Sequence, residues 1–462
     1  MAGILRYGSY VPYFRLQRTA LGDGGRGERA VASYDEDTAS MAVEAARDAL
    51  HGGPAVDALL FSTTSPPYAE KLNAATLQAA LSLPKGVTAL DTGGSSRAGL
   101  SSLLVGSDLA AAGRIPLVCL ADLSVGAPGG ARESGGGDAA AAFIFGDDSE
   151  AIARIVGRAS FTEEVLDTWR TPEMAFPRQW EERFGAEVML PILGDTLKRA
   201  LQSAGLKPDQ VSKVIVDSTN PRVNREFLGL AKVKPEQVAD DLSASVGRAG
   251  AAHAGLMLAK ALDDAAPSDR IVALCGADGA DAIVLEVTDK IGKGRPRRGV
   301  ERWLSSKRND LAYNTYLKWR GILPFEPPRR PDPDRPAGPP MQRSEHWKFG
   351  FIGGRCTSCG AANLPPQRVC VMCGAVDQMA EEPYADADCK IATYTLDYLA
   401  YSMQPPVVAA VVDFAKGGRI NCQLTDVDPQ QVEIGNELEM TFRKMYTAGG
   451  VHNYFWKARP KR

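Results

Sequence analysis

The chain has 462 residues, a formal net charge of −3, and an ordinary globular composition with 44% hydrophobic and 24% charged residues. This length exceeds one typical hydrophobic core, so we expect two or three domains. The near-neutral charge gives no general attraction to nucleic acid or membrane, and no apolar run approaches the roughly 18 residues of a membrane-spanning helix. The N-terminus lacks a signal-peptide layout, and eight cysteines are too few for a disulfide scaffold. We therefore expect a cytoplasmic protein with no nucleic-acid or membrane partner.

The first 288 residues alternate short apolar runs with alanine-rich helical segments. Strands are predicted at residues 57–65, 86–91, 115–122, 139–147, 213–219, 270–277 and 281–287. Helices are predicted at residues 39–50, 72–83, 98–113, 194–205 and 251–265. The helix at 98–113 is nearly apolar all round, which indicates a buried central position. Such alternation predicts an α/β domain with a mostly parallel sheet.

Residues 289–343 differ from what precedes them, with fourteen Lys and Arg against six Asp and Glu. Eight prolines between Pro324 and Pro340 predict an extended linker. Upstream, residues 300–321 interleave aromatic and basic side chains at helical spacing. This pattern indicates either a phosphate-binding face or an amphipathic helix that packs between domains, and both interpretations stay open.

The last part of the chain predicts a metal centre followed by a small β domain. Cys356, Cys359, Cys370 and Cys373 follow the pattern C-x2-C-x10-C-x2-C, which offers four thiolates in two knuckles. Tetrahedral zinc prefers this ligand set, and because no ligand position is left open we expect structural zinc; redox pairing is the weaker alternative. Strand-like runs at 390–401, 405–425, 437–446 and 449–460 predict a closed barrel such as an OB-fold.

Both halves of the chain resemble known families. The region from GRCTSCGAANLPPQRVCVMCG to HNYFWKARP resembles the rubredoxin-like zinc ribbon and OB-fold domain found beside thiolases. The stretches TTSPPYAEKLNAATLQAALSLP, ALDTGGSSRAG, SFTEEVLDTWR and SVGRAGAAHAGLMLAKAL resemble the hydroxymethylglutaryl-CoA synthase branch of the thiolase superfamily. These resemblances imply an α/β thiolase-like duplicated βαβαβ core at 1–288, a connecting segment at 289–343, a zinc ribbon at 344–378 and an all-β OB-fold domain at 379–462. They also imply a homodimer through the thiolase-like domain.

The resemblance implies that four catalytic groups of the synthases are replaced here. Ser96 stands where the family has its nucleophilic Cys, at the start of a buried helix. Thr219 stands at the position of the family's His, Arg248 at that of its Asn, and Thr64 at that of its acid/base Glu. A serine without an activating base is a weak nucleophile, so condensation through an acyl-enzyme is not expected.

Three functions stay open at this point. The leading prediction is an acyl-CoA enzyme that makes or breaks a C–C bond without an acyl-cysteine, by retro-aldol cleavage of a β-hydroxyacyl-CoA. Such a reaction needs a base and donors to an enolate oxygen, and Ser96, Tyr68, Thr219 and Arg248 are the predicted catalytic residues. The alternatives are synthase-like or acyltransferase condensation through Ser96, and a non-catalytic scaffold that binds acyl-CoA.

Three further residues complete the predictions. Arg320 in the basic segment and His452 in HNYFWKARP are predicted contacts of the coenzyme A moiety of the substrate. His253 invites assignment as a base, but its place inside the predicted helix at 251–265 favours a packing role.

Overall fold

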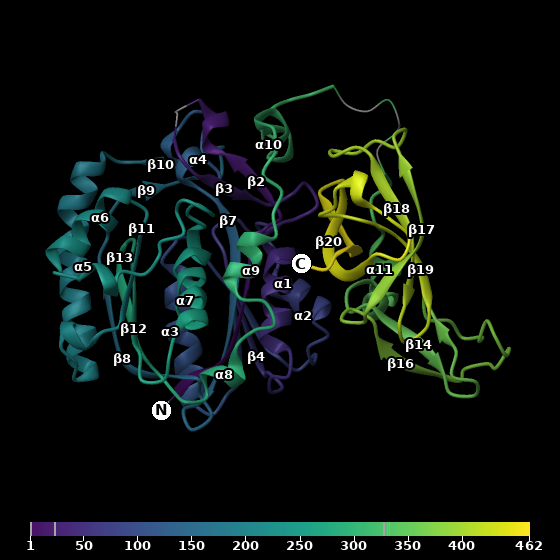
Figure 1. Cartoon of the computed structure of the whole chain (residues 1–462), viewed down its shortest axis with the longest axis horizontal. Coiled ribbons are helices and arrows are strands. Elements are labelled where there is room, and N and C mark those ends of the chain that lie inside the picture. Colours follow the sequence, from purple (N-terminus) through teal and green to yellow (C-terminus); the bar gives the residue numbers. More distant parts are fainter. Residues whose placement is uncertain (1, 23–24, 327–328, 330, 332) are drawn as a thin grey trace. The chain divides into compact units, whose positions relative to one another are not determined.

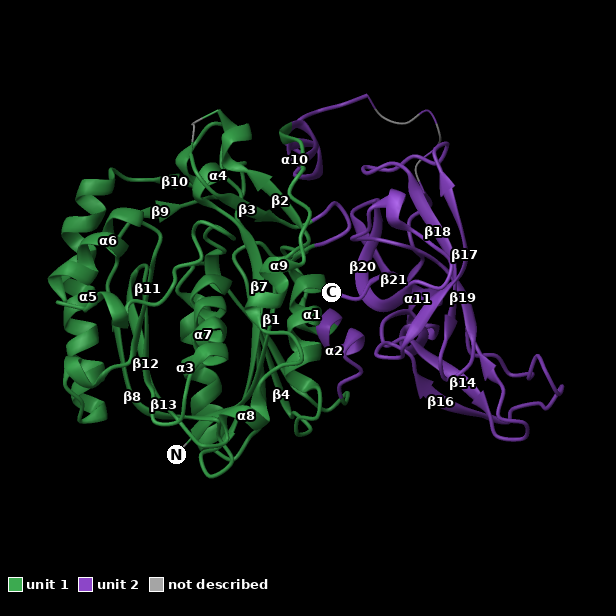
Figure 2. Ribbon diagram, viewed as in Figure 1, with its two compact units in different colours: residues 1–32, 37–75, 84–313 green, residues 33–36, 76–83, 314–462 purple. Residues whose placement is uncertain are grey.

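The computed structural model describes residues 2–22, 25–326, 329, 331 and 333–462. The chain divides into two compact units (Figure 2). Unit 1 comprises Met1–Ala32, Asp37–Ala75 and Pro84–Tyr313, and unit 2 comprises Ser33–Glu36, Thr76–Leu83 and Asn314–Arg462. Two short N-terminal segments therefore cluster with the C-terminal part of the chain.

Unit 1 is built on a sheet of nine strands in the order β11-β12-β13-β8-β1-β7-β6-β4-β5. The strands are β1 (Ala2–Tyr10), β4 (Ala58–Ser62), β5 (Thr88–Thr92), β6 (Pro116–Leu123), β7 (Asp138–Asp147), β8 (Ala153–Thr162), β11 (Lys213–Ser218), β12 (Arg270–Gly276) and β13 (Gly279–Val287). Small pairs are formed by β2 (Phe14–Gln17) with β3 (Glu28–Val31), and by β9 (Thr168–Trp169) with β10 (Arg178–Gln179). All seven strands predicted in this part of the chain are present, and β1 and β8 at the centre of the sheet were not predicted.

The prediction of a mostly parallel sheet is wrong. Parallel pairing joins β4 to β5, β4 to β6 and β11 to β12, whereas β1, β7, β8 and β13 pair with their neighbours in antiparallel fashion. The connection from β12 to β13 shows the reason. Only Ala277 and Asp278 separate these strands, and a parallel crossover needs a dozen residues or more.

Helices lie on both faces of this sheet and between its two halves (Figure 1). The helix α1 (Thr38–Leu50) packs on β1, β7 and β6, and α5 (Glu182–Ala204) packs on β8, β13 and β12. The helices α3 (Ala98–Ala111) and α7 (His253–Asp264) contact strands of both halves and each other, so the central position predicted for residues 98–113 is confirmed. Shorter helices are α2 (Ala74–Ala80), α4 (Ala131–Gly135), α6 (Pro221–Leu230), α8 (Ile291–Gly294) and α9 (Val300–Ser305).

Glycine allows α3 to approach its neighbours closely. A Cβ atom added at Gly99 would lie 1.9 Å from the carbonyl oxygen of Ala251, just before α7. A Cβ atom at Gly106 would lie 2.6 Å from the Val118 side chain on β6. Both contacts are too short for a side chain, so this helix sits where it does because these two residues are glycine.

Unit 2 contains a three-stranded and a five-stranded sheet. The first has the order β15-β14-β16, with β14 (Ile352–Cys356), β15 (Ala362–Asn363) and β16 (Met379–Pro383). The second has the order β19-β18-β17-β20-β21, with β17 (Cys389–Asp397), β18 (Val407–Phe414), β19 (Arg419–Gln423), β20 (Glu437–Ala448) and β21 (Val451–Pro460). A bridge between Leu424 and Ala458 joins its two ends, which closes the sheet as predicted for an OB-fold.

Charged side chains are buried inside unit 2. Asp35 receives hydrogen bonds from Lys457 at 2.9 Å and from Arg443 at 3.3 Å, and all three side chains are at most 1% exposed. Asp426 accepts from Arg443 at 2.6 Å. Paired charges therefore tie segment 33–36 to β20 and β21.

The connecting segment holds short helices. The spacing at residues 300–321 gives two of them, α9 and α10 (Tyr313–Trp319), instead of one long helix. Residues 327, 328, 330 and 332 of the predicted linker lie outside the described residues. The helix α11 (Gly338–Arg343) begins near the end of the linker and is followed by α12 (Glu345–Lys348).

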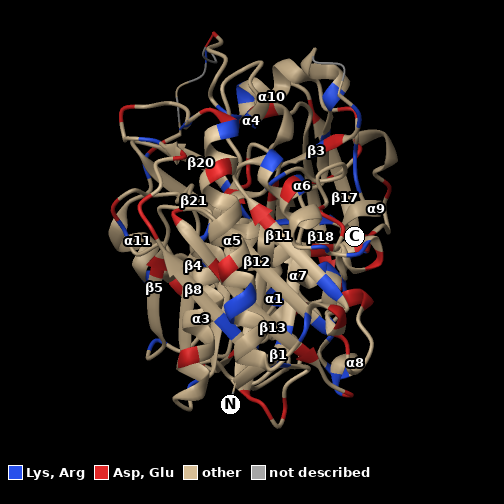
Figure 3. Ribbon diagram, turned by 90° about the vertical axis from the view of Figure 1, so that its left-hand side faces the viewer, with Lys and Arg blue, Asp and Glu red and all other residues tan. Residues whose placement is uncertain are grey.

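Charges of both signs are interspersed over the face that carries α5 (Figure 3). Arg199 pairs there with Asp195 at 2.7 Å. None of the helices within the described ranges combines the length and apolar character needed to cross a membrane.

Candidate active site and zinc centre

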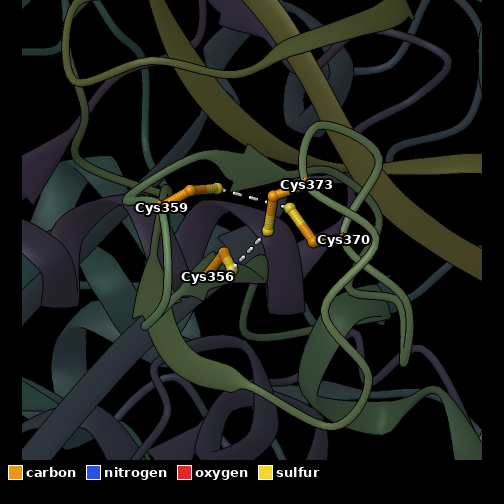
Figure 4. Close-up of side chains that lie close together, drawn as sticks. All are labelled: Cys356, Cys359, Cys370 and Cys373. Carbon is orange, nitrogen blue, oxygen red and sulfur yellow. Dashed lines mark hydrogen bonds between the residues drawn. The ribbon is translucent and has the colours of Figure 1, made fainter.

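The four predicted zinc ligands form one compact group (Figure 4). The Sγ atoms of Cys356 and Cys373 lie 3.7 Å apart, those of Cys359 and Cys370 lie 3.6 Å apart, and all four lie within 4.8 Å of one another. Zinc–sulfur bonds of about 2.3 Å place tetrahedral sulfur atoms about 3.8 Å apart. A disulfide needs about 2.0 Å, so the group fits a zinc ion and not redox pairing.

Backbone geometry prepares the two knuckles for metal binding. Gly360 and Gly374 follow the second Cys of each pair at φ +75° and +72°, a left-handed conformation that glycine adopts without strain. The backbone N–H groups of Cys373 and Met372 lower the pKa of Cys370 to about 6, which favours the thiolate that zinc requires. Asn363 also donates to the Cys370 sulfur at 3.9 Å.

Unit 1 holds two adjoining cavities of about 440 Å³ and about 240 Å³, which we name cavity 1 and cavity 2. Four residues line both of them and mark where they meet: Ser96, Arg132, Thr219 and Gly250. Cavity 1 is also lined by Arg18, Ser124, Arg225, Arg248, His253 and Met257. Cavity 2 is also lined by Thr64, Ser65, Asp167, Trp169, Arg170 and Asp278. Three of the four predicted catalytic residues are thus brought together.

Ser96 lies in the turn between β5 and α3, two residues before the helix begins. The next residue, Arg97, anchors this turn by donating to the Asp281 carboxylate at 2.9 Å and to the Asp278 carbonyl at 2.7 Å. The Ser96 hydroxyl oxygen is buried and has no hydrogen-bond partner among the residues described. Among the described residues, no base is therefore hydrogen-bonded to Ser96 that could activate it as a nucleophile.

Thr219 follows β11 and points its hydroxyl at a buried carboxylate. The hydroxyl donates to Asp167 Oδ2 at 2.9 Å, and Asp167 is 6% exposed. Thr168 and Gln179 donate to the same carboxylate at 3.3 Å and 3.4 Å. Thr219 thus lines both cavities, and Asp167 is an acceptor for its hydroxyl proton.

Arg248 is held at the wall of cavity 1 by an ion pair. One guanidinium nitrogen donates to Asp217 on β11, whose side chain is fully buried. The Nε and Nη1 atoms of Arg248 have no hydrogen-bond partner within the described part of the chain. A fixed cation with unused donors can stabilise negative charge on a ligand oxygen.

Thr64 and Tyr68 differ in their placement. Thr64 lines cavity 2 and donates through its hydroxyl to Asp122 Oδ2 at 2.7 Å. Burial raises the pKa of Asp122, and hydrogen bonds from Ala251 and Thr64 partly offset this increase. Tyr68 lines neither cavity; its backbone N–H donates to Asn73 Oδ1 at 3.1 Å, and its ring lies 5.9 Å from Lys71 Nζ. Its predicted role as an acid or base therefore gains no support from these cavities.

His253 is the first residue of α7 and is 2% exposed. It packs inside the unit, as predicted, and it also lines cavity 1. Burial lowers its pKa, which favours the neutral imidazole.

The two predicted coenzyme A contacts lie in unit 2. The guanidinium of Arg320 lies over the ring of Tyr316 at 5.6 Å. His452 Nδ1 lies 2.8 Å from the Thr447 hydroxyl in the hairpin of β20 and β21. Their contact with coenzyme A stays a prediction.

Four further residues of this region were not predicted from the sequence: Arg132, Asp167, Arg170 and Asp217. Asp167 and Arg170 lie within SFTEEVLDTWR, a stretch that carries the family resemblance. Their place in this stretch could have marked them as candidate site residues. Arg132 lies in a glycine-rich run that resembles a loop, and nothing in its spacing places it at a cavity.

Comparison with known proteins covers both parts of the chain. Models of the ChsH2 rubredoxin-like zinc ribbon domain and the ChsH2 C-terminal OB-fold domain match residues 350–377 and 384–443. The predicted ribbon and OB-fold are therefore confirmed.

The remainder matches synthases. A hydroxymethylglutaryl-CoA synthase of Aeropyrum pernix is 30% identical over 342 residues, which are 70% of this chain and 95% of that protein. One of Caldivirga maquilingensis is 30% identical over 347 residues, which are 70% of this chain and 98% of that protein. A crystal structure of an HMG-CoA synthase complexed with CoA matches with a TM-score of 0.60 at 14% identity, over 69% of this chain and 89% of that one. The thiolase-like fold is thus confirmed, and the chain belongs to the hydroxymethylglutaryl-CoA synthase family.

Proposed function

We propose that the chain is an acyl-CoA enzyme that cleaves β-hydroxyacyl-CoA thioesters by a retro-aldol reaction, without a covalent acyl-enzyme. Acyl-CoA as the substrate class is supported by the relatives, which are named as hydroxymethylglutaryl-CoA synthases, and by the solved structure of an HMG-CoA synthase in complex with CoA. The zinc is structural in this proposal, because four thiolates leave no ligand position open.

The pairing of Thr219 with Asp167, beside a Ser96 without a base, carries the proposal. The substrate β-hydroxyl gives its proton to Thr219 Oγ1 as the Thr219 proton passes to Asp167. The bond between the α and β carbons then breaks, and its electron pair forms the thioester enolate. The β carbon leaves as an aldehyde or ketone. The enolate then takes back, at its α carbon, the proton held by Asp167 and Thr219, which gives a shorter acyl-CoA and restores the Asp167 carboxylate.

Arg248 supplies the donors for the enolate oxygen. Arg248 forms an ion pair with Asp217 through one guanidinium nitrogen. Its Nε and Nη1 atoms have no hydrogen-bond partner among the described residues. Stabilisation of a developing oxyanion by a preorganised donor contributes about 3 kcal/mol in typical enzymes. We assign Thr219 and Asp167 to proton transfer and Arg248 to the enolate.

The test is incubation of the purified chain with a panel of β-hydroxyacyl-CoAs, followed by mass spectrometry of the carbonyl product and the shortened acyl-CoA. We expect cleavage, a fall of about 100-fold or more in kcat for Thr219→Val, and retained cleavage in Ser96→Ala. An acyl group found covalently on the denatured chain, and lost in Ser96→Ala, would instead support condensation through Ser96. Binding of acyl-CoAs without turnover of any substrate would support the scaffold.

We also propose that the body forms a homodimer, as the family resemblance implies. The strand β5 is the outer strand of the nine-stranded sheet, next to β4, and its side chains are half-buried or exposed. Sedimentation equilibrium tests this: a mass of one chain would contradict it.

A further inference from the structure

The helices α5 and α6 lie side by side in unit 1 and leave an apolar groove between them (Figure 1). We name it the α5–α6 groove. Its volume is about 410 Å³, and none of the described residues that line it also lines cavity 1 or cavity 2. The groove is therefore separate from the site assigned above to acyl-CoA. The apolar part of its lining comprises Leu190, Leu197, Leu201, Leu206, Phe227 and Leu230.

The groove exists because α5 is apolar on two faces. One face, which includes Met189 and Leu193, packs into the core of unit 1. Leu190, Leu197 and Leu201 are spaced by seven and four positions, so they share a second face, turned by about 100° from the first. The helix α6 covers this second face only in part, since α5 has 23 residues and α6 has ten. The remainder of the apolar stripe lines the groove.

Gly194 lines the groove and leaves it unfilled. A Cβ atom added there would meet nothing within 4 Å, whereas one added at Gly185 of the same helix would lie 2.4 Å from Asp167 Oδ1. Glycine inside a helix is less favourable than alanine, and it usually serves close packing or function there. Packing of the described chain explains Gly185 but not Gly194. The space beside Gly194 suits a ligand.

The charged side chains that line the groove are those of two lysines, Lys198 and Lys207, and no acidic residue is found among its described lining residues. The next residue on α5, Arg199, pairs with Asp195 at 2.7 Å. Lys198 and Lys207 have no such carboxylate partner in the part of the chain that the structure describes. An apolar groove with two ammonium groups at its edge complements an amphiphile with an anionic head.

The size and surroundings of the groove favour a small molecule over a protein partner. Sites for small molecules have volumes of about 300–1,000 Å³, and the groove falls within that range. Stable protein interfaces bury about 800 Å² of each partner around an apolar centre. The face that carries α5 shows interspersed charges of both signs instead, so the groove opens onto a surface of mixed charge (Figure 3).

We propose that the α5–α6 groove binds a fatty acid, with its hydrocarbon chain against the leucines of α5 and its carboxylate at Lys198 and Lys207. The ligand class is a single unbranched chain with a terminal carboxylate. The chain fills the space beside Gly194 and covers Leu230, whose side chain is 66% exposed. This site shares no lining residue with the two cavities, so the inference does not rest on the proposed retro-aldol reaction.

The experiment measures the binding of decanoate, hexanoate and 1-decanol by isothermal titration calorimetry, with thermal melting to confirm that each variant is folded. Gly194→Leu fills the groove. Gly229→Leu is its matched control, because Gly229 lies in α6 outside the groove lining and a Cβ atom added there also meets nothing within 4 Å. The double variant Lys198→Gln with Lys207→Gln removes both cations, and Arg199→Gln removes a neighbouring cation that does not line the groove.

We expect the unmodified chain to bind decanoate about tenfold or more tighter than hexanoate, because decanoate has four further methylenes that the groove at least half buries. Decanoate should also bind about fivefold tighter than 1-decanol, which lacks the charge. Gly194→Leu should weaken decanoate binding about tenfold or more, and Gly229→Leu should leave it unchanged. The double lysine variant should bind decanoate no tighter than 1-decanol, whereas Arg199→Gln should retain the difference.

Four outcomes overturn the proposal. Absence of saturable decanoate binding shows that the groove holds no such chain, and equal effects of Gly194→Leu and Gly229→Leu place the ligand elsewhere. Equal Kd values for decanoate and 1-decanol in the unmodified chain show that no carboxylate is recognised. Binding to phosphatidylglycerol vesicles that is lost in Gly194→Leu, without binding of free decanoate, assigns the groove to a membrane surface. If Gly194→Leu does not fold, the comparison with 1-decanol and the double lysine variant still decide.

Discussion

The ion pair of Arg248 and Asp217 makes the stability of the fold sensitive to substitution of Asp217. Asp217 is fully buried on β11, and the Arg248 side chain is 17% exposed. Removing the carboxylate leaves a mostly buried cation uncompensated, which costs more than the pair itself contributes. We expect Asp217→Ala to lower the free energy of unfolding by about 3 kcal/mol, measured by urea denaturation.

The double variant Asp217→Ala with Arg248→Met provides the control. It removes both charges, so it should recover most of the stability lost in Asp217→Ala. A double variant as unstable as the sum of its single variants would show that the charge pairing does not cause the loss.

The same residues show how far the site could be predicted from the sequence. Ser96, Thr219 and Arg248 were found because each occupies a position at which the family has a recognisable group. Asp167 and Asp217 were missed because their importance depends on partners that are distant in the chain: Thr219 lies 52 residues from Asp167, and Arg248 lies 31 residues from Asp217. Such pairs leave no local spacing, and no periodicity can reveal them.

The contact between α3 and the turn before α7 leads to a prediction about two glycines. Gly99→Ala would force its Cβ against the Ala251 carbonyl, so α3 must move, and Ser96 lies three residues away. We expect destabilisation by about 1–3 kcal/mol, as for overpacking of a core, together with impaired acyl-CoA binding. Calorimetric melting and the Kd of a β-hydroxyacyl-CoA check both effects.

Gly194→Ala is the matched control within a helix. Gly194 lies inside α5, and a Cβ atom added there meets nothing within 4 Å. Alanine should stabilise this helix by about 1 kcal/mol because it has the higher helix propensity. Similar effects of the two substitutions would contradict the close approach at Gly99.

The strands of the nine-stranded sheet were not all equally predictable from the sequence. The seven strands found from their apolar runs are short or buried on both faces, a pattern that sequence reveals directly. The strand β1 reads AGILRYGSY and β8 reads ARIVGRASFT, and each carries arginine and glycine within its apolar residues. They lie at the centre of the sheet because β7 and β13 pair with them, a tertiary choice that overrides local pattern.

The ribbon is expected to depend on its metal. We expect one zinc per chain by elemental analysis, and a lower melting temperature after treatment with a strong chelator, because thiolate coordination and folding are coupled. Cys370→Ser should lose the zinc. Cys422→Ser, which changes a cysteine of β19 outside the group, should retain it.

For the whole molecule, the buried charges of unit 2 predict how stability depends on pH. Burial alone would raise the pKa of Asp35, but the charges of Lys457 and Arg443 hold it well below its usual value. A carboxyl with a lowered pKa stabilises the folded state above its unfolded pKa of about 3.9, and this stabilisation is lost as the pH falls below that value. We expect urea midpoints to fall steeply below about pH 4.

The variant Asp35→Asn tests whether Asp35 causes this loss of stability below about pH 4, which we call the acid limb. The variant should lose about 3 kcal/mol at pH 7, and its difference from the unmodified chain should shrink as the pH falls from about 4 to 2. Asp377→Asn removes the exposed partner of Arg368 and should change neither the stability at pH 7 nor the acid limb. An unchanged acid limb in Asp35→Asn would show that other groups cause it.

The pairing of Asp35 with Lys457 also has a consequence for biosynthesis. These residues are 422 positions apart in the chain. At about 5–20 residues per second, a ribosome needs on the order of 20–80 s to make Lys457 after Asp35. Throughout that time the basic partners of the acidic side chains in segment 33–36 have not yet been synthesised. The segment must therefore stay hydrated while the following strands fold. The barrel can close only after Lys457 has been made, and a truncation before Lys457 would leave Asp35 without this partner.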